Sequence, residues 1–185
     1  RMSRGLGDVY KRQKFKCRLM PYMFSSAVNT HLTGVPTMRA MILEFQSDHC
    51  CDDLDRQYML GSDLMVAPVF SEDGDVEYYL PKGKWTHVLN GKKYEGGSWQ
   101  SENYDFFSLP LMARENSIIP FGANDQTPEY DYTDGLALNI FELGSKAETV
   151  VYDRKGNKAM TVKAVNDNGN VAISFDGNGK NLTVI

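Results

Sequence analysis

The sequence lacks a long apolar run and has few cysteines, and both features narrow its class. No stretch of its 185 residues approaches the roughly 18 to 20 consecutive apolar residues of a membrane helix. We therefore expect no membrane partner. The three cysteines, two of them adjacent at Cys50 and Cys51, fit neither a disulfide framework nor a zinc site. This pattern favours a reducing compartment, and we expect a cytoplasmic protein.

The common catalytic and nucleotide-binding motifs are also missing. There is no nucleophile elbow, P-loop or dinucleotide fingerprint. The chain is nevertheless 42% apolar and 11% aromatic, which excludes a disordered or collagen-like protein and predicts a sizeable core. The residues by themselves identify no catalytic apparatus, and we expect no cofactor and no metal ion.

Basic side chains are concentrated at the N-terminus, although the formal net charge is -4. Nucleic-acid binding would rest on this one tail, so we expect no nucleic-acid partner. Residues 1–13 show no helical or strand periodicity and resemble a translated sequencing adaptor. We predict that residues 1–13 are a non-native tail.

Hydrophobic periodicity predicts a helix followed by a buried strand. Apolar side chains recur every three or four residues over 14–33, as on one face of an amphipathic helix, and Pro21 must kink this helix or lie in its first turn. Gly34 and Pro36 mark its end. Residues 37–45 are almost continuously apolar, which is typical of a strand covered on both faces. This succession suggests an α/β layer.

The remaining chain has the texture of small antiparallel β-modules. Between residues 68 and 124, short strand-like runs alternate with glycines and prolines. The β-signal resumes within 125–185, where Asn-Gly turns suit tight hairpins. We therefore predict two β-modules, with residues 122–134 as the linker between them.

Several polar residues are candidates for chemistry. The acidic loop 48–55 contains His49, Cys50 and Cys51 and could in principle bind a metal ion, but no second Cys or His pair follows, so a solvated loop whose acids cap the next helix is favoured. His31 lies on the apolar stripe, which favours a packing histidine over a catalytic base. His87 has no acidic partner nearby in sequence.

Two further patterns have a structural and a functional interpretation. Residues 181–183 (Asn-Leu-Thr) match a glycosylation acceptor, which requires a secreted context. Aromatic side chains in the first β-module could form a sugar-stacking platform, although a core role is favoured. These residues are Trp85, Trp99, Tyr94, Tyr104, Phe106 and Phe107.

Five ordered phrases carry a family resemblance. They are 17–24 (CRLMPYMF), 34–41 (GVPTMRAM), 43–46 (LEFQ), 55–70 (DRQYMLGSDLMVAPVF) and 79–86 (YLPKGKWT). This wording resembles glycoside hydrolase family 31 from about Lys14 to Gly122, and the rest is similar to that family's distal C-terminal domain. Within the family it looks most like the bacterial α-xylosidases, because Arg39-Ala40-Met41 stands where α-glucosidases more often carry Arg-Pro-Leu.

The resemblance implies a fold and a domain order. Residues 14–67 would be the closing α/β part of a (β/α)8 barrel, followed by all-β sandwich domains. Residues 68–124 would form the proximal C-terminal β-sandwich and residues 125–185 a truncated distal β domain. Intact members of the family are often homo-oligomers.

The resemblance also implies a retaining α-xylosidase that acts on oligosaccharides. Both catalytic aspartates of the family lie upstream of the matched part, so we expect a C-terminal fragment without catalytic residues and without activity. Gln46 and Asp48 would lie near the pocket rim, but neither matches a binding residue of the family, so substrate-binding residues stay unassigned. The alternatives are an α-glucosidase of the same family and a non-catalytic carbohydrate-binding β-module.

Overall fold

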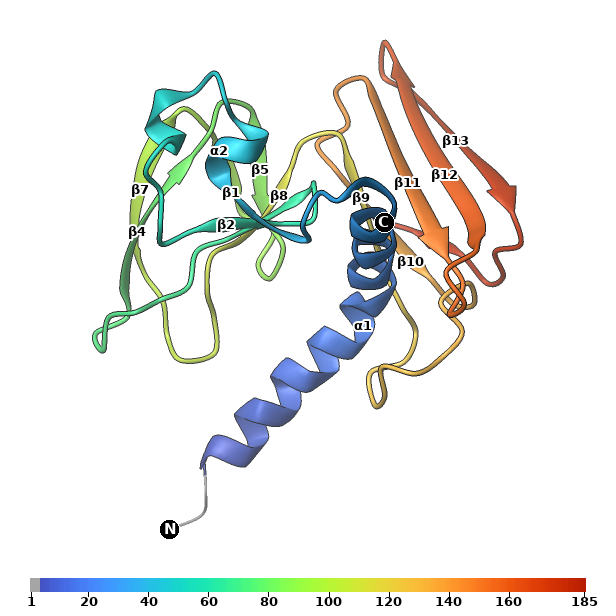
Figure 1. Ribbon diagram of the computed structural model, residues 1–185, viewed down its shortest axis with the longest axis horizontal. Helices are drawn as coiled ribbons and strands as arrows, with labels where there is room; N and C mark the ends of the chain where they lie inside the picture. Colours follow the sequence, from blue (N-terminus) through green and yellow to red (C-terminus); the bar gives the residue numbers. More distant parts are fainter. Residues whose placement is uncertain (1–3) are drawn as a thin grey trace.

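The computed structural model describes the backbone of residues 4–185 and the side chains of residues 10–185. It is mostly β, with one long helix, α1 (Arg4–Thr33), at the N-terminus. Figure 1 shows two β lobes, with the C-terminal half of α1 beside the second lobe. No helix in residues 4–185 combines the length and apolarity needed to cross a membrane.

The first lobe contains a six-stranded antiparallel sheet, in the order β1-β2-β3-β8-β5-β6, and a separate antiparallel pair, β4-β7. Its elements are β1 (Met38–Ala40), α2 (Met41–Glu44), the 3-10 turn η1 (His49–Cys51), β2 (Tyr58–Leu60), β3 (Leu64–Val66), β4 (Asp75–Leu80), β5 (Lys84–His87), β6 (Lys93–Glu95), β7 (Ser98–Asn103) and β8 (Leu111–Arg114). The predicted boundary between residues 67 and 68 falls between β3 and β4, so it separates β1, β2 and β3 from β5, β6 and β8 of the same sheet.

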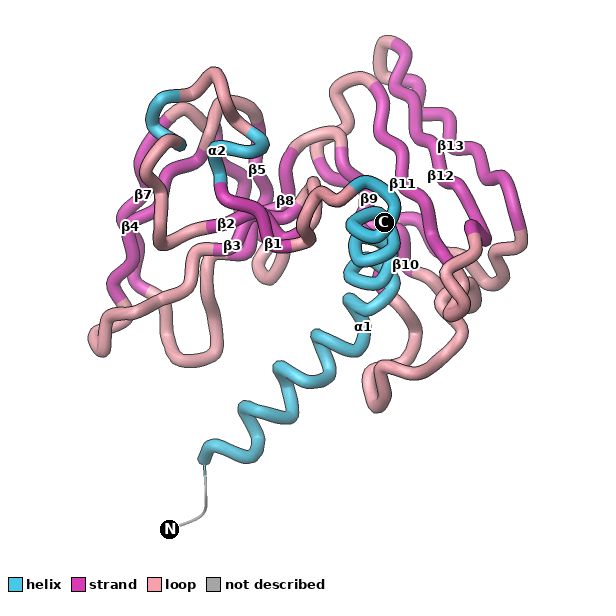
Figure 2. The backbone as a smooth tube through the Cα atoms, in the orientation of Figure 1, coloured by secondary structure: helices cyan, strands magenta, loops and turns pink. Residues whose placement is uncertain are grey.

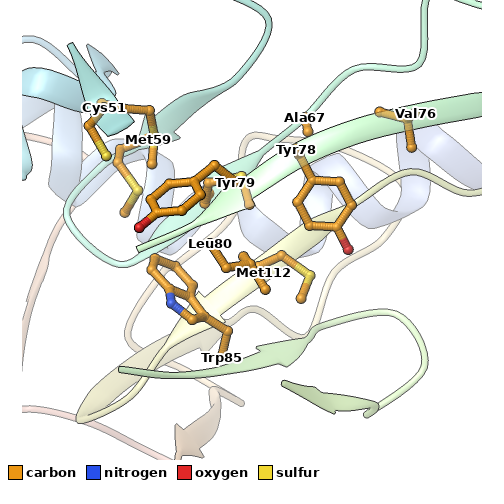
Figure 3. Close-up of a cluster of buried hydrophobic side chains, with 11 residues drawn as sticks. Cys51, Met59, Ala67, Val76, Tyr78, Tyr79, Leu80, Trp85 and Met112 are labelled. Carbon is orange, nitrogen blue, oxygen red and sulfur yellow. The ribbon is translucent and has the colours of Figure 1, made fainter. Parts of the chain in front are cut away.

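The core of the first lobe is rich in aromatic and sulfur-containing side chains. Figure 3 shows Trp85, Tyr78 and Met112 meeting between the two sheets, with Met59 and Cys51 nearby. Trp85 is fully buried, and its indole Nε1 donates to the Pro81 carbonyl at 2.8 Å. A buried indole with a satisfied N–H is a structural residue.

The second lobe consists of two three-stranded sheets, β14-β10-β9 and β11-β12-β13. All neighbouring strands are antiparallel except β10 and β14, which are parallel. The strands are β9 (Ser117–Phe121), β10 (Ala137–Phe141), β11 (Lys146–Tyr152), β12 (Lys158–Asp167), β13 (Asn170–Gly177) and β14 (Thr183–Val184). The predicted boundary between 124 and 125 lies in the loop from β9 to β10.

The expected end of a barrel is not evident in residues 4–185. The strand predicted over 37–45 is wrong, because β1 ends at Ala40 and Met41 begins α2. Strand β1 also pairs antiparallel with β2, whereas barrel strands run parallel. The physical reason lies in burial: Met41 is buried, but Ile42 and Leu43 are exposed, so the apolar run is not covered on both faces. Short apolar runs do not distinguish strand from helix.

The predicted helix over 14–33 is confirmed, and it continues N-terminally through the predicted tail to Arg4. In this N-terminal extension the Tyr10 hydroxyl donates a hydrogen bond to Gln126 Oε1 at 3.3 Å. At the other end, Gly34 has a φ of +77° and its N–H donates to the Thr30 carbonyl at 2.8 Å, as the sequence predicts for a helix stop. His31 is exposed, so its expected packing role is wrong.

Helix α1 packs against both lobes, and Figure 2 shows it, in cyan, beside the magenta strands of the second. Leu19 and Tyr22 join a core that contains side chains from β3, β8 and β9. Met20 and Phe24 pack against the core of the second lobe. Two hydrogen bonds fasten the helix, from the Tyr22 hydroxyl to the Leu60 carbonyl and from the Tyr130 hydroxyl to the Cys17 carbonyl, both at 2.7 Å.

We expect Gly61→Ala to destabilise the chain, because the β2–β3 turn is closed by Tyr22. A Cβ at Gly61, where φ is +68°, would lie 2.3 Å from the Tyr22 hydroxyl. The clash and the backbone strain together predict a loss of about 2 to 4 kcal/mol in the free energy of unfolding, measured by urea denaturation.

Gly91→Ala is the matched control, since Gly91 has a φ of +74° and no atom within 4 Å of its Cβ position. Strain alone predicts a loss of about 1 kcal/mol there. Equal losses at the two positions would contradict the proposed contact between α1 and the turn.

Candidate functional site

A groove of about 1050 Å³ crosses the outer face of the β4-β7 pair. Cross-strand pairing places Trp99 opposite Tyr79 and Ser101 opposite Glu77 on this face. The lining side chains are Asp53, Leu54, Asp55, Arg56, Gln57, Pro68, Phe70, Ser71, Asp75, Val76, Glu77, Trp99 and Ser101. The two-stranded pair therefore forms the floor, and the segments before β2 and after β3 form the walls.

Trp99 presents an aromatic surface on this floor. Its side chain is 57% exposed, whereas Trp85 is 1% exposed. The Trp99 ring lies against the Tyr79 ring, with centroids 5.6 Å apart and a tilted geometry. The Tyr79 hydroxyl in turn donates to Asp48 Oδ2 at 2.9 Å. Trp99 thus rests on a side chain that is itself held in place.

Gln57 attaches one wall of the groove to the floor. Its amide Nε2 donates to the Tyr79 carbonyl, and the Tyr79 N–H donates to Gln57 Oε1, both at 2.8 Å. The side chain is buried and satisfies both backbone groups of Tyr79 on the edge of β4 that faces away from β7. The Gln57 amide thus makes the two hydrogen bonds that a neighbouring strand would otherwise make to Tyr79, and it holds the 53–57 segment beside the floor.

The acidic loop that precedes this wall is a structural cap. Asp48 Oδ1 accepts from the Cys50 N–H at 3.2 Å and caps η1, as the capping interpretation predicts. His49 Nδ1 lies 3.1 Å from Asp52 Oδ2 at the surface. Among the side chains that the structure describes, residues 10–185, no group of three or more His, Cys, Asp or Glu is placed to hold a metal ion. Gln46 is exposed.

The aromatic residues of the first lobe have different environments. Trp85 is in the core, Tyr94 and Tyr104 are half-buried, and Trp99, Phe106 and Phe107 are exposed. The expectation of a core role is confirmed for Trp85 and wrong for Trp99, Phe106 and Phe107. Sequence alone could not separate the two tryptophans, because β5 and β7 give similar local signals and only sheet pairing decides which face is covered.

A polar cluster surrounds the half-buried carboxylate of Glu102 on the inner face of β7. Glu102 accepts hydrogen bonds from the hydroxyls of Tyr78, Tyr94 and Tyr104 at 2.7 to 2.8 Å, and from Lys92 Nζ at 2.7 Å. Burial raises the pKa of Glu102, but the bonds from Lys92 and the three tyrosines outweigh it and lower the pKa to about 2. The sequence did not signal this cluster, since its members come from different strands.

His87 lies beside this cluster and is fully buried. Its ring stacks on Tyr104 at 5.8 Å, and its Nδ1 accepts from the Leu89 N–H at 3.2 Å. Burial lowers the pKa of His87, although the nearby Glu102 opposes this effect. The acidic neighbour of His87 is therefore Glu102 of β7, which is distant in sequence. The buried imidazole acts as a neutral packing group.

The second lobe contains the remaining sequence candidate, Asn181. It is exposed, and its amide Nδ2 donates to Asp134 Oδ1 at 2.8 Å. Its φ is +51°, in the left-handed region that asparagine tolerates. The side chain therefore helps to close the turn before β14.

Comparisons with known proteins match both lobes to one family. Residues 34–119 match the domain described as Glycosyl hydrolase family 31 C-terminal domain. Residues 131–185 match the domain described as Alpha-xylosidase YicI, C-terminal domain. The first range begins directly after α1 and covers the first lobe, and the second begins in the β9–β10 loop.

Individual relatives agree with these matches. Alpha-xylosidase XylQ of Lactiplantibacillus pentosus is 36% identical over 88% of this chain and 22% of its own length. An alpha-xylosidase of Emericella nidulans is 36% identical over 97% of this chain and 25% of its own. The cycloalternan-forming enzyme of Listeria monocytogenes, solved with a pentasaccharide substrate, superposes with a TM-score of 0.77 at 30% identity, over 87% of this chain and 16% of that one. The chain thus spans about a quarter or less of these relatives.

We expect Glu102→Gln to lower the free energy of unfolding at neutral pH by about 1 to 3 kcal/mol, because it removes the charge that four donors stabilise. The folded pKa of about 2 lies below the ordinary 4.5. The stabilisation is therefore complete above pH 4.5 and is lost as the pH falls toward 2. Denaturation of both proteins across this range should show their difference shrinking with acidification.

Glu95→Gln on the neighbouring β6 is the control, since Glu95 is exposed. It should change stability little at any pH. A difference between Glu102→Gln and the unsubstituted chain that stays constant from neutral pH to pH 2 would contradict the proposed charge stabilisation.

Proposed function

Because the chain belongs to glycoside hydrolase family 31 and comprises its C-terminal domains, we propose that it is the C-terminal region of a retaining α-xylosidase that releases terminal α-linked xylose from oligosaccharides. The observation that carries the choice of xylose is the match of residues 131–185 to an α-xylosidase C-terminal domain. The two α-xylosidases described above, each 36% identical, support it.

In this proposal the chemistry takes place outside the chain. Retaining glycosidases use two carboxyl groups about 5 to 5.5 Å apart, one as nucleophile and one as acid and then base. We assign neither role to any of the 185 residues, since the chain corresponds to only 22% and 25% of the two α-xylosidases. Its two lobes serve as a support for a catalytic domain supplied by the rest of the enzyme.

We propose that α1 adjoins the catalytic (β/α)8 barrel in the intact enzyme. The support is a set of exposed apolar side chains at the C-terminal end of α1 and on the β1-α2 segment that follows. Leu32 is 67% exposed, Met38 63% and Leu43 51%. These exposed apolar side chains are available for a protein contact.

We further propose that the enzyme is cytoplasmic and forms homo-oligomers. Cys50 is an exposed free thiol, and Cys17 and Cys51 are buried free thiols. An exposed free cysteine is best maintained in a reducing compartment. The homo-oligomer is proposed by analogy with the family.

The activity of the full-length gene product tests the proposal. We expect it to hydrolyse an aryl α-xyloside at least about tenfold faster, as kcat/KM, than the corresponding aryl α-glucoside, with α-xylose as the first product seen by NMR. The 185-residue chain alone should show no turnover, because it holds neither catalytic carboxylate.

The outcomes separate the alternatives. Preference for the glucoside would replace xylose by glucose as the substrate of the same family. Turnover by the 185-residue chain would contradict the absence of catalytic residues. Initial formation of β-xylose would contradict the retaining mechanism.

A further inference from the structure

The groove over β4 and β7 is lined by exposed apolar side chains that are not part of the hydrophobic core. Trp99 is 57% exposed on the floor, and Phe70 is 70% exposed on the wall. An exposed indole in a concave surface has apolar area available for a ligand. Trp85, by contrast, is buried in the core and has no surface available for a ligand.

Polar groups of both hydrogen-bonding types surround the indole. Glu77 and Ser101 form the next cross-strand pair along the floor, roughly 7 Å from the pair of Trp99 and Tyr79. Asp55 and Arg56 line the wall. Carboxylates only accept, a guanidinium only donates, and a serine hydroxyl does both. This mixture matches ligand hydroxyl groups, which donate and accept at the same atom.

The floor is rigid before any ligand arrives. Tyr79 supports the Trp99 ring, and its own hydroxyl is fixed by Asp48. Gln57 holds the backbone of Tyr79 from the wall side through two hydrogen bonds of 2.8 Å. A ring held in this way loses little conformational entropy on binding.

The geometry points to a carbohydrate-binding groove on the first lobe, in which Trp99 stacks on the apolar face of a pyranose ring of a neutral oligosaccharide while Glu77 and Asp55 accept hydrogen bonds from its hydroxyls. The groove binds without catalysis, and only the choice of a xylose-bearing sugar for its test rests on the proposed function. A basic peptide is the competing occupant, because carboxylates outnumber cations in the lining. The exposed indole on the floor and Arg56 on the wall favour the neutral sugar.

Calorimetric titration of the 185-residue chain with a xylose-bearing glucan oligosaccharide tests this inference. We expect saturable binding that is about tenfold weaker in Trp99→Ala, within about threefold of the original in Trp99→Phe, and insensitive to salt. Phe175→Ala is the matched control, since Phe175 is an aromatic side chain, 46% exposed, on the second lobe. It should bind like the unsubstituted chain.

A parallel titration with a lysine-rich peptide resolves the competing occupant. Peptide binding that weakens with salt and with Glu77→Gln, in the absence of sugar binding, would overturn the inference in favour of a peptide site. Absence of sugar binding, or sugar binding equal in Trp99→Ala and the unsubstituted chain, would overturn it as well. Circular dichroism checks that each variant is folded. We expect every variant to fold, because the substituted side chains are exposed.

Discussion

The packing of α1 against both β lobes is the contact on which the rest of the structure depends. Leu19 and Tyr22 enter one core while Met20 and Phe24 enter another. The apolar residues of α1, which recur every three or four positions, thus pack against two cores and not against a single sheet. Strand β9 repeats this division, since Ile118 points into the second-lobe core and Ile119 into the core shared with α1.

Local signals in the sequence predicted the elements better than their partners. The helix over 14–33, its stop at Gly34 and the β-rich remainder follow from periodicity and backbone preference, which are local. The strand prediction over 37–45 is wrong because an apolar run has the same composition in a buried strand and in a short strand followed by a helical turn. The burial of Trp85 and exposure of Trp99 depend on sheet pairing, which no local pattern encodes.

The candidate site shows the same limit. Its floor needs Tyr79 and Trp99, which are 20 positions apart and meet only because β4 pairs with β7. Gln57 was part of a family phrase, but nothing in that phrase indicated that its amide would pair with the backbone of β4. In our proposals these parts have separate tasks: α1 and its adjoining cores support the catalytic domain, and the open face of β4-β7 binds a ligand.

The coding DNA upstream of Lys14 provides the most direct test of the central claim, that this chain is the C-terminal part of a family 31 enzyme. We predict a reading frame that continues upstream into a (β/α)8 barrel with two suitably placed aspartates. A reading frame that holds no such barrel would contradict it.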